Sequence, residues 1–400
     1  MLGNCYILDL CCASKPEISS RTGRRLDQVR KVILIQVLNS FVAGILGVVL
    51  PLMMEAREID IVTIGFIFAS MPIIFQTLRM LFATVSDFWG RKIFFVFNGF
   101  LGVLSNLTYY LAYTPLGFLF GKVSEGAKGA SLWAVNRAFL LEKSEDKWAV
   151  LVGLRTAAYI PLAVGSLIAG FLIVFLLFEG TLLLCALIGG LVIPVALLLV
   201  SGTKKKFSLA KALHFLDFRN KGRIFKVFLV LFLVMGFSFG FRGGFIFPLF
   251  LSRNGFDVES IGVILGFQML IAGLFSYLFA RRFKLERIIL VSGILSTVML
   301  VFLGFSGSVL AASLVLALGM AGGLSGIGEE GLLSRITSKD SYGTDIGLLW
   351  MGFHLGETLS LALAGILISI AGFAVPFLMS ALIYIPFYVT SFFMLRRQTS

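Results

Sequence analysis

Charged side chains lie inside long apolar stretches of this sequence. Lys122, Glu125 and Lys128 follow one another at intervals of three within one apolar run, and His354 and Glu357 are three apart within another. Residues three apart lie on the same face of a helix. A buried carboxylate beside a cation can take up or release a proton, so these groups predict proton exchange and the binding of a small molecule.

Other polar groups interrupt apolar runs elsewhere, and Asn39, Arg242 and the Glu329-Glu330 pair are the main ones. Adjacent glutamates point about 100° apart on a helix, so we expect only one of them to face a cavity and take Glu330 as the candidate. A charge at the bilayer centre costs at least ~2.5–3.5 kcal/mol, which favours a cavity or a partner over lipid. Fixed ion pairs that only hold the helices together are the alternative interpretation.

The composition excludes a soluble globular protein. Of the 400 residues, 58% are hydrophobic and 14% are charged, and the mean hydropathy is +0.99. Soluble domains use about half apolar and about a quarter charged residues. We therefore predict an all-α membrane protein that lies in the lipid bilayer as a multi-pass chain.

Twelve apolar runs are each long enough to cross ~30 Å of hydrocarbon as a helix. Their approximate bounds are 31–54, 61–85, 93–113, 116–141, 148–174, 178–200, 226–251, 260–280, 287–305, 309–334, 343–370 and 373–395.

The basic residues gather on one side of these predicted crossings. The connections on the opposite side hold only two basic residues, Arg57 and Arg253, against six acidic ones. Lys and Arg mark cytoplasmic loops, so we expect both termini in the cytoplasm and the chain in the cytoplasmic membrane. The net charge of +13 is then a signature of topology, and no nucleic-acid partner is expected.

The order of the runs predicts two six-helix halves. We expect a cytoplasmic tail over residues 1–30, a first half over 31–201, a basic linker over 202–225, a second half over 226–395 and a cytoplasmic end over 396–400. The halves resemble each other: Gly153-Leu154-Arg155 and Gly347-Leu348-Leu349 each follow a charged turn. Parallel halves of this kind are typical of secondary transporters.

A charged turn, Ser86 to Lys92, separates the second and third runs. It contains Asp87, two residues, and then Gly90-Arg91-Lys92. This turn, at this place among twelve runs, resembles the signature of the major facilitator superfamily. The family pattern has glycine where this chain has Ala83, and the arginine and glycine of its fourth-helix signature correspond to Lys122 and Gly126. The glycine-proline pair of drug and proton antiporters is absent near Gly165.

The resemblance implies a secondary transporter that works by alternating access, with Asp87, Gly90, Arg91 and Lys92 as an inner gate. It also implies that helices 1, 4, 7 and 10 line a central cavity, flanked by helices 2, 5, 8 and 11. The candidates for substrate binding and coupling fall on these helices; they are Asn39, Lys122, Glu125, Lys128, Arg242, Glu330, His354 and Glu357.

We expect a small-molecule substrate and protons as the binding partners. Proton-coupled efflux of amphipathic compounds is the first hypothesis, and proton-coupled uptake of an organic anion is the second. A membrane sensor or scaffold without transport is a third, from another class. No metal-ligand spacing, nucleophile elbow or Walker loop is present, so we expect no enzyme, no cofactor and no metal. The sequence carries no signal of oligomeric state.

Overall fold

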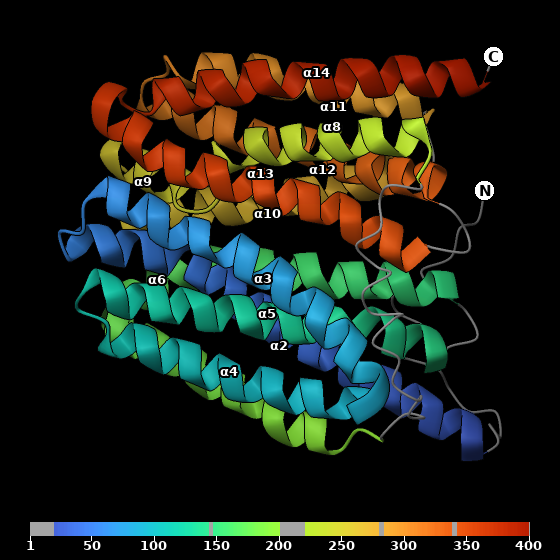
Figure 1. Cartoon of the computed structure of the whole chain (residues 1–400). Coiled ribbons are helices and arrows are strands. Elements are labelled where there is room, and N and C mark those ends of the chain that lie inside the picture. The colour runs from blue at the N-terminus through green and yellow to red at the C-terminus, as the bar shows by residue number, and fades with distance from the viewer. Residues whose placement is uncertain (1–19, 144–146, 201–220, 280–283, 338–341, 400) are drawn as a thin grey trace.

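The computed structural model describes residues 20–143, 147–200, 221–279, 284–337 and 342–399, without the side chains at 20–26, 87, 141–143, 147–153, 155–156, 342–344 and 398–399. All regular elements in these ranges are helices (Figure 1). They are α2 (Ser20–Ala56), α3 (Ile61–Trp89), α4 (Arg91–Leu111), α5 (Pro115–Lys143), α6 (Lys147–Leu197), α8 (Arg223–Gly240), α9 (Ile246–Arg253), α10 (Val258–Phe279), α11 (Leu285–Leu303), α12 (Ser308–Ile336), α13 (Tyr342–Ala371) and α14 (Ala374–Thr399).

Ten of the described helices are long and apolar enough to cross a membrane. Two further points bring the number of crossings to the predicted twelve. The helix α6 contains two crossing segments that meet at Leu177, where the backbone leaves helical geometry (φ 58°, ψ 178°). The helix α5, which carries six charged residues between Lys122 and Lys143, packs on α3 and α4 and is the fourth crossing.

Two helices have other bounds than the predicted runs. The first helix begins at Ser20, inside the expected tail over 1–30, while residues 1–19 and most of the linker, 201–220, lie outside the described residues. The run 226–251 is not one helix, because it breaks between Gly240 and Ile246. Gly244 has a φ of +58° at this break, a backbone conformation that glycine adopts easily and other residues rarely adopt.

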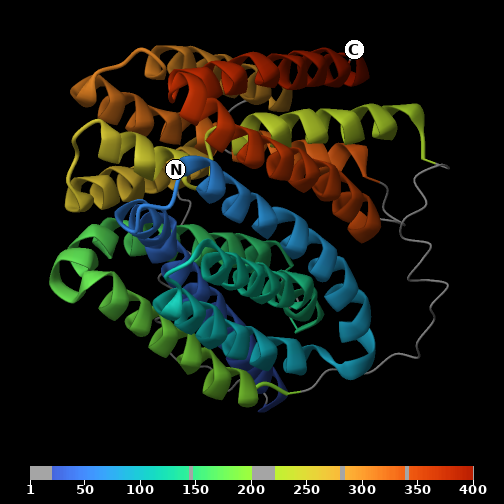
Figure 2. The same ribbon diagram turned by 60° about the vertical axis from the view of Figure 1, so that its left-hand side comes forward.

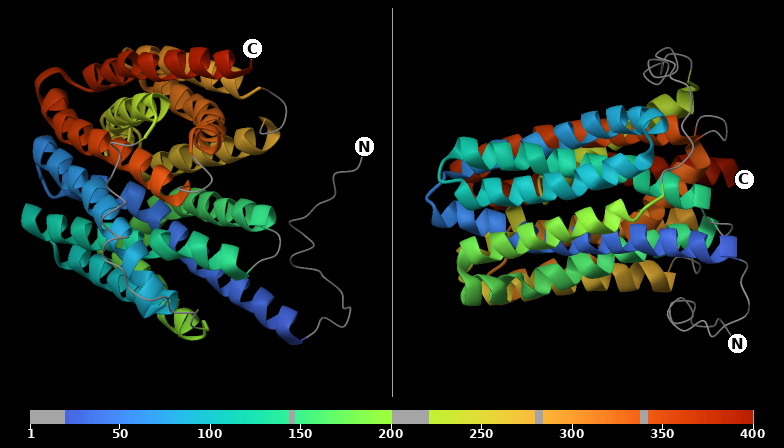
Figure 3. Two further views of the ribbon diagram at one scale, coloured as in Figure 1. Left: turned by 45° about the vertical axis from the view of Figure 1, so that its right-hand side comes forward. Right: turned by 90° about the horizontal axis from the view of Figure 1, so that it is seen from below.

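The helices form two groups, with α2–α6 below and α8–α14 above in Figure 1. Within the first group α2 and α4 pack on α6, and α3 packs on α5; within the second, α8 packs on α13 and α11 packs on α12 and α14. Helices of a group run alongside one another in both panels of Figure 3. The groups meet mainly where α3 packs on α13 and α6 packs on α10, as the turned view of Figure 2 also shows for α3 and α13.

We define the distal end of the bundle by the connections at 57–60, 112–114, 254–257, 304–307 and 372–373, and the linker end by residues 90 and 221–222. Two matching aspartates begin helices at the distal end. The backbone N–H of Thr63 donates to Asp60 at 2.9 Å, and that of Ser260 donates to Asp257 at 2.8 Å. The side-chain hydroxyl groups of Thr63 and Ser260, and then these backbone N–H groups, lower the pKa of the two carboxyl groups because they stabilise the charged form.

Glycines bring the two groups into backbone contact near the distal end. A Cβ atom added to Gly365 of α13 would lie 2.5 Å from the carbonyl oxygen of Ile61 on α3. At the second crossing, a Cβ on Gly262 of α10 would lie 2.8 Å from the carbonyl oxygen of Ser166, and one on Gly170 would clash with Val258. Small residues permit such close approach of membrane helices. The two crossings occupy corresponding places in the two halves.

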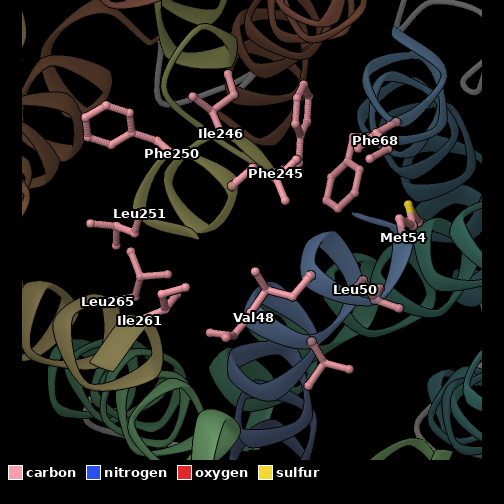
Figure 4. Close-up of a cluster of buried hydrophobic side chains, with 14 of the residues drawn as sticks. Val48, Leu50, Met54, Phe68, Phe245, Ile246, Phe250, Leu251, Ile261 and Leu265 are labelled. Carbon is pink, nitrogen blue, oxygen red and sulfur yellow. The ribbon is translucent and has the colours of Figure 1, made fainter. Parts of the chain in front are cut away.

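Among the described residues, the cluster of buried apolar side chains that joins the halves lies at the distal end. One cluster combines residues of both groups, and Figure 4 shows Val48 and Phe68 from the first group directed toward Phe245 and Ile261 from the second. The rings of Phe68 and Phe245 lie 5.5 Å apart. Toward the linker end, the first group has its own cluster and the second group has another. The structure is therefore closed at the distal end by a shared core and lacks such a shared core at the linker end, within the described residues.

Substitution of Gly170 tests whether the glycine crossing holds the distal end closed. We expect Gly170→Ala to destabilise the protein by about 1–3 kcal/mol, because the added methyl group must push α10 away. The melting temperature of the purified protein and the spin-label distance across the distal end measure the two effects.

Gly47→Ala is the matched control, since nothing lies within 4 Å of a Cβ at that position. An unchanged distal distance in Gly170→Ala would show that the crossing does not hold the halves together.

Candidate functional site

The charged turn joins α3 to α4 at the linker end. Gly90, with a φ of +86°, ends α3, and its N–H donates to the carbonyl oxygen of Ser86 at 3.1 Å. The Lys92 ammonium donates to the carbonyl oxygen of Leu197 at 2.6 Å, which ties the turn to the end of α6. The turn thus has the tight reversal that the sequence predicts. The side chain of Asp87 lies outside the described residues.

Lys122 and Glu125 of α5 form an ion pair inside the first group, with 2.9 Å between Nζ and Oε2. Tyr109 of α4 also donates to this Glu125 oxygen, at 2.6 Å. The Lys122 ammonium lies 4.2 Å from the centre of the Phe68 ring. The two side chains are 5% and 11% exposed, so this carboxylate is enclosed by the first half and accepts bonds from two donors.

Lys128 and Asn39 also lie within the first group. They line a small pocket together with Asn98, and all three are buried. The Asn39 amide donates to Asn98 Oδ1 at 2.8 Å, and the Asn98 amide donates to the Lys128 carbonyl oxygen at 2.8 Å. These bonds connect α2, α4 and α5. The predicted stripe of three charges on α5 is therefore present, but Lys122, Glu125 and Lys128 face the interior of their own half.

His354 and Glu357 lie on the face of α13 that meets the other half. The distance from His354 Nδ1 to Glu357 Oε2 is 2.8 Å, and each side chain is 15% exposed. Phe75 of α3 packs against the imidazole with 5.3 Å between ring centres. Trp350 and Phe353 of α13 flank the imidazole at 5.9 Å and 5.3 Å. The structure thus brings this predicted pair together and places it between the halves.

Arg242 lies in the break between α8 and α9. Its guanidinium is 5.3 Å from the ring centre of Tyr384 and 5.8 Å from that of Phe239. The Tyr384 hydroxyl lies 2.9 Å from Ser325 Oγ, and Ser325 donates to Glu329 Oε1 at 2.9 Å. Glu329 therefore takes part in a polar chain of the second half, whereas Glu330 is directed elsewhere.

Glu330 reaches the first half. Its carboxylate lies 3.8 Å from the guanidinium of Arg137 on α5, and both side chains are more than 40% exposed. A second bond crosses between the halves where the buried Gln76 amide of α3 donates to the carbonyl oxygen of Gly347 at 3.0 Å. Sequence reasoning missed Arg137 and Gln76. Both are polar residues within apolar runs, which was the available signal.

No group of three His, Cys, Asp or Glu side chains converges as a metal site in the part of the chain that the structure describes. The polar groups instead fall into three sets: the Lys122 set inside the first half, the Arg242 set inside the second, and His354, Glu357, Arg137 and Glu330 between them.

The family model of the Major Facilitator Superfamily matches residues 32–329 of the chain. A search of curated proteins gives no match. Two structures of the nucleoside transporter NupG are similar: a mutant form has a TM-score of 0.77 and 16% identity, covering 91% of this chain and 98% of its own, and another has 0.73 and 15%, covering 92% and 99%. The human organic anion transporter MFSD10 (TETRAN) has a TM-score of 0.68 and 14% identity, covering 94% of this chain and 100% of its own.

The family match extends over more than half of the chain and agrees with the observed fold. It confirms the resemblance that the turn, the twelve crossings and the two halves indicate. The chain is a multi-pass membrane protein of the major facilitator superfamily.

Proposed function

We propose that the protein is a proton-coupled secondary transporter that exports amphipathic small molecules. The observation that carries this proposal is the His354–Glu357 pair, 2.8 Å apart and packed against Phe75 of the other half. Movement of one half against the other changes the surroundings of this pair. Its affinity for a proton then depends on which side of the membrane is open, which is the requirement for coupling.

The charge of the pair depends on protonation. A carboxylate against a protonated imidazole carries no net charge, and loss of one proton leaves a single negative charge near the contact with α3. Such a charge costs free energy wherever water is excluded. A proton on the pair therefore favours the state in which water is excluded from it, and its release favours the state in which water reaches it.

The aromatic residues around the pair support an amphipathic cargo. Trp350 and Phe353 lie beside His354, and Phe239 packs on Phe353 at 5.5 Å. Phe239 is 40% exposed and so offers a ring face to a ligand. The structural neighbours transport a nucleoside in one case and an organic anion in the other, as their names state.

We place the linker end in the cytoplasm of a cell whose plasma membrane contains the protein. Lys221 and the basic residues of the charged turn, Arg91 and Lys92, lie at this end, while Arg57 and Arg253 lie at the distal end. The distribution of Lys and Arg supports this orientation. The shared distal core then closes the outer side, and the substrate enters from the cytoplasm. The same fold without transport, as a sensor, is tested by the experiments below.

Substitution of Glu357 tests the coupling. We expect Glu357→Gln to lower pH-gradient-driven transport at least tenfold in proteoliposomes with an internal pH dye, because glutamine cannot exchange a proton, while downhill exchange of substrate continues. Export should appear as substrate movement against inward proton flow.

Glu58→Gln is the control, since Glu58 is an exposed residue of a distal connection. Gradient-driven transport that survives in Glu357→Gln, or a wild type that ignores an imposed pH gradient, would refute proton coupling through this pair.

Glu125 should behave differently from Glu357, although both are predicted coupling residues. Glu125→Gln leaves the buried Lys122 ammonium without its carboxylate, which costs about 3–5 kcal/mol. We expect a lower melting temperature with coupling retained in the folded fraction. If Glu125→Gln lost coupling without a loss of stability, Glu125 and not Glu357 would be the site of proton exchange.

The charged turn is proposed as the inner gate, with Asp87 and Arg91 closing the cytoplasmic side and Gly90 and Lys92 shaping it. We expect Asp87→Asn to lower the rate of transport several-fold with little change in substrate affinity, because a gate acts on the conformational step. Initial rates over a range of substrate concentrations separate the two quantities. Unchanged turnover in Asp87→Asn would remove the gate from the mechanism.

A further inference from the structure

Arg242 is a cation at the break of the seventh crossing. The preceding helix α8 ends at Gly240, the following helix α9 begins at Ile246, and Gly243 and Gly244 lie between Arg242 and α9. The break is held against the other half, because a Cβ on Gly244 would lie 3.1 Å from the Phe68 ring. Arg242 thus lies next to the shared distal core, on an irregular segment of backbone.

The guanidinium of Arg242 lies close to aromatic rings but pairs with no described acceptor. Tyr384 and Phe239 lie 5.3 Å and 5.8 Å from it. Its Nε atom is buried and makes no hydrogen bond, and no carboxylate of the described residues lies within 4.0 Å. The side chain as a whole is partly exposed.

Glu329 is the acidic residue whose charge acts on Arg242 in the second half, but it is not in contact with it. Glu329 accepts the Ser325 hydroxyl at 2.9 Å, and Ser325 in turn lies 2.9 Å from the Tyr384 hydroxyl. An aromatic and hydroxyl layer therefore separates the two charges. A buried donor of a charged group is costly to leave without an acceptor, so this site favours an acceptor from a bound molecule.

We propose that Arg242 binds the carboxylate of the transported molecule, so that the substrate is an organic acid with an aromatic or other apolar body. This inference rests on the proposed transport function and names the chemical class of its substrate.

The aromatic neighbours of Arg242 suit this class. Rings near a guanidinium stabilise its charge, and the N–H groups in its plane match the two oxygens of a carboxylate. The partly exposed ring of Phe239 contacts both Arg242 and Phe353, and Phe353 in turn contacts His354. An acid held at Arg242 can therefore rest its apolar body on Phe239 and extend toward the titratable pair.

Equilibrium binding tests this assignment with phenylacetate and its neutral amide, phenylacetamide, on the purified full-length protein. Further aryl and alkyl acids are each compared with their own amides. The shift in melting temperature and the quenching of tryptophan fluorescence measure affinity, since Trp350 lies beside this region. We expect wild type to bind the acids at least tenfold more tightly than the amides. Arg242→Gln should remove that preference, and Arg242→Lys should restore part of it.

Arg253→Gln is the matched control, because Arg253 is a partly exposed arginine of the same crossing that already pairs with Glu55 at 3.3 Å. Its acid preference should equal that of wild type. Inorganic phosphate, included as a further arm, should bind weakly, because it has no apolar body. Strong phosphate binding lost in Arg242→Gln would show a site for inorganic anions and overturn the organic acid.

Equal affinity of acids and amides in wild type, or an acid preference that persists in a folded Arg242→Gln, would also overturn the proposal. Arg242→Lys keeps the charge, so it remains informative if Arg242→Gln does not fold. These measurements use no pH gradient and no transport. Binding specificity can therefore fail while proton coupling stands, and the reverse, so the two proposals are tested separately.

Discussion

The close approach of backbones at two glycine crossings is the constraint on which the rest of this structure depends. Gly65 and Gly365 allow α3 to meet α13, and Gly170 and Gly262 allow α6 to meet α10. A Cβ atom at Gly170, Gly262 or Gly365 would lie less than 3.0 Å from the backbone of the other half, so the helices there would have to move apart. The distal core forms because the crossings bring its two sets of side chains together. The crossings also leave the linker end without a shared core among the described residues.

Inside each half, glycines likewise allow neighbouring helices to approach closely. Gly44 and Gly165 bring α2 onto α6, and Gly236 and Gly356 bring α8 onto α13 at the corresponding place of the other half. Lipid is as apolar as a helix surface, so burial of apolar area drives membrane helices together only weakly. Close packing and hydrogen bonds must supply the stability instead. Both halves have glycines at corresponding helix contacts that permit this close packing.

The sequence predicted the fold well because lipid allows few solutions. Twelve apolar runs, the side on which Lys and Arg fall and the turn around Gly90 are each local patterns, and together they specify the family. The break at Arg242 was missed, since Gly243-Gly244 within an apolar run is compatible with a continuous membrane helix. By contrast, the junction at Leu177 inside α6 agrees with the prediction, because the runs 148–174 and 178–200 lie on either side of it.

The candidate site was less predictable, because the direction of a buried side chain depends on tertiary packing. Spacing put Lys122, Glu125 and Lys128 near one face of α5 but could not show that this face meets α4 rather than the other half. The same spacing in His354 and Glu357 gave a pair between the halves. Arg137 and Gln76 connect the halves and were not singled out, since a lone polar residue within an apolar run has many ordinary explanations.

The place of the His354–Glu357 pair along α13 bears on the proton coupling that we propose. His354 lies eleven residues, or about 16 Å, from the crossing at Gly365 toward the linker end. If the halves rock about the glycine crossings, displacement grows with distance from them. The surroundings of a group at the crossing would not change, and a group at the linker end would be in water in either state. The pair at His354 lies between these limits and packs on Phe75 of α3, so a modest rotation changes its surroundings, as the proposed coupling requires.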